Sequence, residues 1–212
     1  MKTNNFLTQQ SNQTYYKELL SFIDQQYKTK TIYPNKKDIF NAYNFNQENI
    51  KVIIIGQDPY HQYNQANGYA FSCNTNKLPP SLKNIYKELY NDLKIIKTNG
   101  NLINWFNQGV ILINTILTVE ESKPLSHNNN LYDKLFNNFI NYINNLDQPI
   151  VFLLWGNNAK KYKPLINNKF YILQSSHPSP LSYHKGFYNS KPFSKINNYL
   201  KINNIKPIDW SK

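Results

Sequence analysis

Residues 52–61 read VIIIGQDPYH, an apolar run that ends abruptly in a glycine and a cluster of polar residues. Three more short runs of β-branched, leucine or aromatic side chains cover residues 110–113, 150–155 and 170–173. Each run is too short for a helix, and a continuous apolar run is typical of a strand that is covered on both faces. The four runs therefore predict a central, short, four-stranded parallel sheet.

Segments with helical spacing separate these predicted strands. Apolar residues recur at intervals of three and four from 82 to 93 and again from 131 to 143. Before the first strand, residues 15–27 predict a helix and residues 38–43 a shorter one. Alternating strands and helices predict an α/β fold with helices on both faces of the sheet. We expect residues 1–212 to form a single domain whose residues 1–14 are a flexible N-terminal segment.

The composition bounds the class of protein. The chain has 212 residues and a net charge of +12, with 24 basic residues that are all lysine. This length suits one domain, and 17 Tyr and 12 Phe supply a core that a disordered chain lacks. The positive charge favours a polyanionic partner such as nucleic acid, although a coat of solvated lysines is the alternative. Without arginine, phosphate contacts must come from lysines, hydroxyls and backbone N–H groups.

Cysteine content and hydropathy indicate the compartment. The single cysteine, Cys73, excludes an internal disulfide framework and multi-cysteine metal sites, which is typical of a reducing compartment. No stretch approaches the roughly 18 consecutive apolar residues of a membrane span, and the N-terminus lacks the apolar core of a signal peptide. We therefore expect a cytoplasmic protein with no membrane association.

Several catalytic classes are disfavoured by missing motifs. The four histidines do not follow zinc-ligand spacing, and the Pro-Cys-x-x-Cys element of zinc deaminases is missing. No G-x-x-x-x-G-K loop is present to cradle a nucleoside triphosphate. A triad could be assembled from Asp58, His177 and a serine, but no G-x-S-x-G motif exposes a nucleophile.

Polar segments follow each of the four predicted strands. They are GQDPYH at 56–61, NT at 114–115, GNN at 156–158 and QSSHPSPLS at 174–182. Open parallel sheets bind ligands at the carboxyl ends of their strands. The sequence therefore predicts a site at this edge with one carboxylate, one imidazole, amides and hydroxyls.

Each candidate side chain also has an ordinary structural explanation. Asp58 could form an Asx turn, His177 could be a hydrogen-bonded loop histidine, and Asn114 could cap a turn. Ser81 could be a helix N-cap, and Phe71 and Leu181 could be packing residues. Singly, these residues are weak indications of function. Their common order and spacing is the stronger observation.

Over residues 33–210 the chain resembles family 1 uracil-DNA glycosylases. The motifs that carry the resemblance are GQDPYH (56–61), QA (65–66) with Gly68 and FS (71–72), PPSLKNIY (79–86), GVILINTILTV (109–119), LLWG (153–156), HPSPLS (177–182) and PIDW (207–210). GQDPYH and HPSPLS, in this order and at this separation, are highly specific.

The resemblance implies an enzyme of base-excision repair. It would flip a uracil nucleotide out of single- or double-stranded DNA, hydrolyse the N-glycosidic bond and leave an abasic site. Asp58 would hold the attacking water and stabilise the positive sugar, and neutral His177 would donate a hydrogen bond to the departing uracil. The resemblance implies no metal and no cofactor, a monomer, and a protein inhibitor that mimics DNA as a further partner.

The remaining site residues are also assigned by resemblance. Phe71 would stack on uracil, Asn114 would pair with its edge, Tyr60 would exclude the methyl group of thymine, and Gln57 would add contacts to the base. Leu181 would fill the space that the flipped nucleotide leaves. Contacts to the DNA backbone are expected from Ser81, Gly156, Asn157, Ser179, Ser182 and Lys185.

Four departures from the family pattern concern loops. Gln62-Tyr63-Asn64 stands where the family usually has Gly-Pro-Gly. Asn157 replaces a small residue and Lys185 an arginine, both at expected DNA contacts. The stretch 189–192 (NSKP) replaces the family's Gly-Cys-x-His.

Two rival functions stay open at this point. One is a DNA-binding or replication-processivity subunit of the same family without catalytic activity. The other is a glycosylase that also cleaves the strand through a lysine Schiff base, although no lysine falls among the matched catalytic positions.

Overall fold

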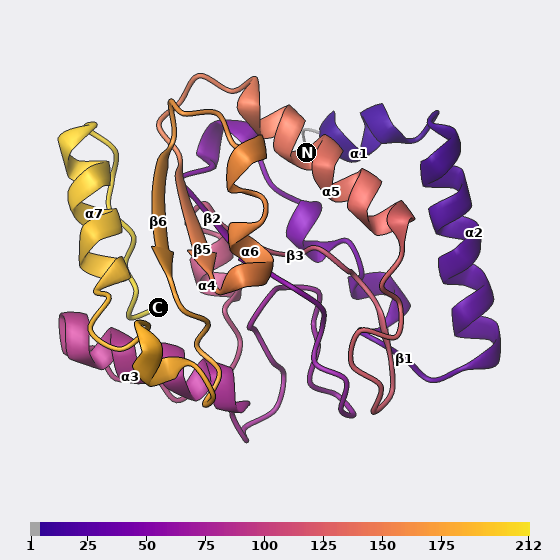
Figure 1. The fold of residues 1–212 in the computed structure, drawn as a ribbon, viewed down its shortest axis with the longest axis horizontal. Coiled ribbons are helices and arrows are strands. Elements are labelled where there is room, and N and C mark those ends of the chain that lie inside the picture. Colours follow the sequence, from indigo (N-terminus) through magenta and orange to yellow (C-terminus); the bar gives the residue numbers. More distant parts are fainter. Residues whose placement is uncertain (1–4) are drawn as a thin grey trace.

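The computed structural model describes residues 5–212, whose centre is a four-stranded parallel sheet (Figure 1). Its strands are β2 (Val52–Gly56), β3 (Val110–Asn114), β5 (Val151–Trp155) and β6 (Tyr171–Ser175). Their order across the sheet is β3-β2-β5-β6, and all neighbours are parallel. The predicted sheet is thus confirmed, with each strand within two residues of its expected bounds.

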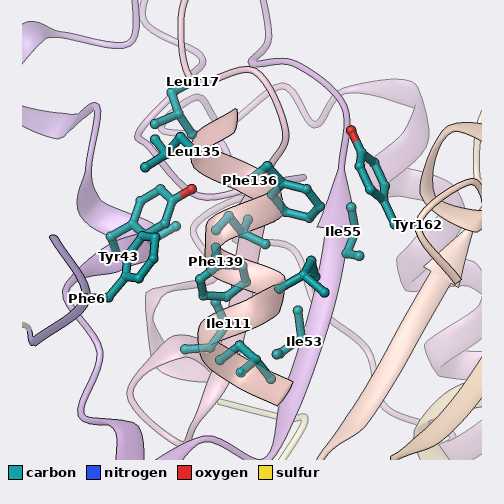
Figure 2. Close-up of a cluster of buried hydrophobic side chains, with 14 of the residues drawn as sticks. Phe6, Tyr43, Ile53, Ile55, Ile111, Leu117, Leu135, Phe136, Phe139 and Tyr162 are labelled. Carbon is teal, nitrogen blue, oxygen red and sulfur yellow. The ribbon is translucent and has the colours of Figure 1, made fainter. Parts of the chain in front are cut away.

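Side chains of the central strands alternate between two cores, one on each face of the sheet. Ile53 and Ile111 belong to the first core, shown in Figure 2, and Ile54 and Leu112 to the second. The helices of the first face are α1 (Asn5–Gln10), α2 (Thr14–Thr29) and α5 (Asn130–Asn144), and those of the second are α3 (Pro80–Leu93), α4 (Ile103–Phe106) and α7 (Pro192–Ile202). The prediction of helices on both faces is confirmed.

Short elements complete the described chain. Strand β1 (Ile32–Tyr33) pairs antiparallel with β4 (Val119–Glu120), apart from the main sheet. The short helices are α6 (Asn157–Lys160) and the 3-10 turns η1 (Lys36–Asp38), η2 (Asn41–Tyr43), η3 (Gln47–Asn49), η4 (Lys163–Leu165) and η5 (Tyr183–Lys185). Two 3-10 turns, rather than one helix, thus cover most of the predicted segment 38–43.

Strand β6 differs from the doubly covered strand that its apolar run predicts. It is one of the two edge strands of the sheet, and Tyr171 and Gln174 are exposed, whereas the other edge strand, β3, is fully buried. The Tyr171 ring stacks on Tyr199 of α7 at 4.8 Å between ring centroids. Aromatic contact with α7 therefore covers part of the exposed Tyr171 side chain.

The N-terminal segment is ordered by one aromatic side chain. Phe6 of α1 is fully buried, stacks on Tyr43 at 5.4 Å and meets the edge of Phe139 at 5.7 Å (Figure 2). The prediction of a flexible segment over residues 1–14 therefore differs from the structure over residues 5–14. Residues 1–4 lie outside the described residues. The sequence signal was weak because one adjacent pair of apolar residues, Phe6 and Leu7, among polar residues has no periodicity.

We expect Phe6→Ala to lower the free energy of unfolding by about 3–5 kcal/mol, because it leaves a cavity among Tyr43 and Phe139. Urea unfolding measures the loss. Ile202→Ala is the matched control, since Ile202 is 81% exposed and its truncation should cost no more than about 0.5 kcal/mol. Equal stabilities of the two variants would show that α1 does not dock on the core.

Candidate active site

A pocket of about 200 Å³ opens where β2 and β3 end. Seven of the predicted site residues line it: Gln57, Asp58, Tyr60, Phe71, Ser81, Asn114 and His177. They come from the segment between β2 and α3, the first turn of α3, the last residue of β3 and the loop after β6. The edge of the sheet that the sequence singled out therefore holds one concave site.

A second hollow of about 180 Å³ adjoins the first and shares Gln57 and His177 with it. Gly156 and Asn157, two of the expected DNA contacts, line this hollow. Asn158 lies beside them and donates a hydrogen bond from Nδ2 to Gln57 Oε1 at 2.7 Å. Sequence analysis did not assign Asn158 a role, although it belongs to the polar segment that follows β5.

Gly56 is required by the close approach of the two strand ends. In the β2–β3 register Gly56 pairs with Asn114, and a Cβ atom at position 56 would lie 2.2 Å from Asn114 Oδ1. It would also lie 2.8 Å from Ala70 Cβ. The missing side chain therefore leaves the space that the Asn114 amide occupies at the pocket wall, where Asn114 is only 7% exposed.

Asp58 is held by a loop that sequence analysis did not single out. Its Oδ2 accepts a hydrogen bond from the Leu125 backbone N–H at 2.8 Å, and Pro124 lines the pocket beside it. Burial raises the pKa of Asp58 above its ordinary value, while the Leu125 N–H and His61 oppose that shift. Only the tertiary structure brings this loop to Asp58, because the contact spans 67 residues.

The surroundings of His177 select one protonation state. Its Nδ1 accepts a hydrogen bond from the Ser179 backbone N–H at 3.1 Å, so the neutral ring carries its proton on Nε2. Burial lowers the pKa of His177 below 6.5, which keeps the ring neutral at pH 7. A Cβ atom at Gly156 would lie 2.7 Å from His177 Cβ, so this glycine makes room for the histidine.

Phe71 has an unusual backbone conformation at the pocket. Its φ of 63° lies in the left-handed region, which is costly for a bulky residue and typical of functional sites. The Tyr60 hydroxyl donates a hydrogen bond to the Phe71 carbonyl at 3.3 Å, and the Phe71 ring meets Trp155 edge-on at 5.3 Å. These contacts hold the ring against the pocket, 5.9 Å from the His177 ring.

The loop after β6 presents an exposed leucine, and hydrogen bonds from serine side chains hold the backbone of this loop. Ser182 Oγ donates to the His177 carbonyl at 2.8 Å and lies 2.9 Å from Ser179 Oγ, while Ser176 Oγ donates to the Ser182 carbonyl at 2.7 Å. Leu181, between these serines, is 86% exposed. The leucine is therefore not a packing residue of the fold, which removes its ordinary explanation.

The other expected DNA contacts lie around this loop. Ser81 is the second residue of α3 and not its N-cap, because the helix begins at Pro80 and its N-cap is Pro79. Ser81 lines the pocket instead. Lys185 is exposed at the end of η5. The structure therefore places every expected DNA contact near the pocket mouth or on its adjoining loops.

Two departures from the family pattern place asparagine in the left-handed region. Asn64 has a φ of 55° and Asn189 a φ of 61°, and asparagine tolerates this conformation better than most residues do. The buried Glu88 carboxylate also accepts hydrogen bonds from the backbone N–H groups of Asn189 and Lys191 at 2.8 and 2.9 Å. The turns of these loops are therefore formed without the usual glycines.

Among residues 5–212, no group of three or more His, Cys, Asp or Glu side chains is placed to hold a metal ion. That the reaction needs neither metal nor cofactor stays a prediction.

A model of the Uracil DNA glycosylase superfamily matches residues 43–201 of this chain. The chain belongs to that superfamily. The uracil-DNA glycosylase of Clostridium beijerinckii is 50% identical over 210 residues, which cover 97% of this chain and 93% of the relative. A protein named uracil-DNA glycosylase 2, from Listeria monocytogenes serotype 4b, is 48% identical and covers 96% and 93%.

Solved structures of the superfamily share the fold. The crystal structure of mimivirus uracil-DNA glycosylase superposes with a TM-score of 0.88 at 28% identity, covering 99% of this chain and 87% of the other. A variant of the mimivirus protein in complex with UGI gives a TM-score of 0.90 at 30% identity, with coverages of 99% and 88%. The whole described domain therefore matches the glycosylase fold.

We expect NMR of the imidazole nitrogens to show His177 neutral at pH 7, with its proton on Nε2. The midpoint of its titration should lie below the ordinary pKa of 6.5, since burial disfavours the charged ring. His177→Gln assigns the signal by removing it. A protonated ring at pH 7, or a proton on Nδ1, would contradict the hydrogen bond from Ser179.

Proposed function

We propose that the protein is a family 1 uracil-DNA glycosylase, which hydrolyses the N-glycosidic bond of uracil in DNA and leaves an abasic site. The observation that carries the proposal is the pairing, in one pocket, of the Asp58 carboxylate with an imidazole whose Nε2 bears a proton. Membership of the superfamily and relatives of this name support it. The reaction begins base-excision repair.

The two groups complement the charge that develops on bond cleavage. The departing base becomes negative and the sugar positive, so a polar pocket that offers a donor on one side and a carboxylate on the other lowers the barrier. The His177 Nε2–H donates a hydrogen bond to the oxygen of the leaving uracil, and the imidazole itself is neutral. Asp58 stabilises the oxocarbenium-like sugar and orients the water, and Leu125 fixes the carboxylate by its backbone N–H.

Selection of uracil follows from the pocket walls. The Asn114 amide offers both a donor and an acceptor, which match the edge of uracil and mismatch that of cytosine. Phe71 stacks on the base, and Gln57, held by Asn158, adds contacts to it. Tyr60 stands where the methyl group of thymine would collide, so thymine is rejected by a clash.

Base flipping is supported by the loop around Leu181. Leu181 is exposed, and hydrogen bonds of the neighbouring serines hold the backbone of its loop. The leucine can therefore enter the base stack and fill the space that the flipped nucleotide leaves, without needing hydrogen bonds of its own. The phosphate backbone of the DNA is bound by hydroxyls, N–H groups and one lysine. These groups belong to Ser81, Gly156, Asn157, Ser179, Ser182 and Lys185. Single-stranded and duplex DNA are both substrates.

We further propose a monomer that acts in the cytoplasm. None of the helices within residues 5–212 combines the length and the apolar character that a membrane span requires. A protein inhibitor that mimics DNA would bind the same face, and the mimivirus relative in complex with UGI supports that partner.

The deciding experiment is an incubation of the purified protein, with and without EDTA, on labelled oligonucleotides that contain U, T or C at one position. We expect alkali-dependent scission at U only. Asp58→Asn should lower the rate by at least about 100-fold, because it removes the charge while its amide oxygen can still accept from Leu125. Unfolding and DNA binding of the variant are the controls and should be nearly unchanged.

Other outcomes of this assay separate the rival functions. Tight DNA binding without scission at U would favour a non-catalytic DNA-binding subunit. Scission without alkali, together with a borohydride-trapped adduct, would favour a lyase that acts through lysine. Scission at U that EDTA abolishes would overturn the metal-free mechanism.

We expect Leu181→Ala to reduce kcat/KM more on duplex than on single-stranded substrate, by about tenfold, since unstacking costs a few kcal/mol in a duplex and less in a single strand. Rates on paired substrates of the same sequence measure this ratio. Ile202→Ala, a truncation of another exposed aliphatic residue, should leave the ratio unchanged. Equal losses on both substrates would contradict a wedge role for Leu181.

A further inference from the structure

The exposed face of α3 carries a stripe of lysines and a tyrosine that the reaction does not use. Lys83, Lys87 and Tyr90 follow one another at intervals of four and three residues, so they share one side of the helix, and Lys94, the left-handed C-cap of α3, lines the same hollow. All four are exposed, and they span about 16 Å along the axis. The stripe begins two residues after Ser81 and leads away from the pocket.

Two adjoining hollows run along this stripe. The first, of about 280 Å³, lies between Pro80 and Pro180, which directly precede Ser81 and Leu181. The second, of about 630 Å³, extends to Ile96 and Tyr188. Both hollows are lined by Lys83, Lys87 and Tyr183, so they form one depression, which we call the α3 groove. It is continuous with the loops that are proposed to grip DNA.

The charge of the α3 groove has one sign. The described residues that line it include four lysines and no acidic residue. The two acidic side chains nearby on α3 face residues 189–194 instead. Glu88 accepts from the backbone N–H groups of Asn189 and Lys191, and Asp92 accepts from that of Ser194 at 2.9 Å.

Exposed aromatic rings line the same groove. Tyr90 is 51% exposed and Tyr188 53% exposed, which is unusual for side chains of this size in a chain that buries most of its aromatic residues. Lys94 Nζ lies 5.3 Å from the centre of the Tyr90 ring, and Lys87 Nζ lies 6.0 Å from that of Tyr183. Aromatic faces interleaved with cations are the pattern on which single-stranded nucleic acids stack.

We propose that the α3 groove is a second nucleic-acid site, which holds unpaired nucleotides of the substrate strand beyond the one in the pocket. The inference rests on the proposed function and adds a contact to it. A peptide with acidic and apolar residues would suit the same chemistry. Nucleic acid is favoured because the groove starts at the residues that precede Ser81 and Leu181.

The test compares kcat/KM on a short single-stranded substrate with substrates extended by unpaired nucleotides on the 5′ or the 3′ side. We expect extension on one side to raise kcat/KM by about five- to tenfold, the gain of one or two stacked bases. Tyr90→Ala/Tyr188→Ala and Lys87→Gln/Lys94→Gln should abolish this gain and leave the short substrate unaffected. The lysine variant should also reduce the salt dependence of binding, by about 0.7 in the log–log slope per lysine.

A matched control keeps the charge change and moves it to the opposite face. Lys17 of α2 and Lys134 of α5 are exposed beside the first core, so Lys17→Gln/Lys134→Gln should retain the full gain from extension. Thermal unfolding shows whether the tyrosine variant still folds. The lysine variant tests the groove independently, because exposed lysines contribute little to stability.

Several outcomes would overturn the proposal. Either no gain on extension in the wild type, or a gain that survives in both groove variants, excludes a nucleic-acid role for the groove. If binding of a labelled peptide of alternating Asp and Phe is lost in the groove variants while DNA affinity is unchanged, the groove docks a protein instead. Failure to release uracil from the short substrate overturns the proposed function alone. In that event the affinities of uracil-free oligonucleotides of both lengths test the groove directly.

Discussion

The site depends on the parallel pairing of β2 with β3, which places Gly56 against Asn114 at the carboxyl edge of the sheet. At this point the backbone of one strand and the side chain of the other share a space that no Cβ atom could enter. The pairing continues beyond the strands, where the Ile116 N–H donates to the Gln57 carbonyl at 2.9 Å. The Asn114 amide and the Asp58 carboxylate, which both line the pocket, are therefore positioned by one register.

Burial has opposite consequences for the pKa values of the two titratable groups that we propose to be catalytic, Asp58 and His177. It raises the pKa of Asp58 and lowers that of His177, because in each case water stabilises the charged form and the pocket wall does not. One backbone N–H per group, from Leu125 and from Ser179, then fixes the orientation of the carboxylate and the tautomer of the imidazole. Both donors are backbone N–H groups, so these two hydrogen bonds depend on the conformation of the loops rather than on the residue types of Leu125 and Ser179.

The sheet and its main helices were predictable because their signals are local. Apolar runs of about five residues and three- to four-residue periodicity report burial directly. Helix α1 was not predictable, since a lone Phe6 has no period and is ordered by contacts with Tyr43 and Phe139. The exposure of β6 was missed for a related reason: an apolar run does not reveal how completely the packed layers cover a strand, and of the two edge strands β3 is buried while β6 is partly exposed.

The sequence by itself determined the α/β class, the four strands and the pocket residues that its motifs carry, because spacing and residue type are properties of one chain segment. Only the tertiary structure decided that Leu125 anchors Asp58, that Asn158 holds Gln57, and that the α3 groove begins beside Pro80 and Pro180. Each of these joins segments that are distant along the chain. Such contacts depend on how the layers pack, and no local pattern encodes the packing of two segments that meet only after folding.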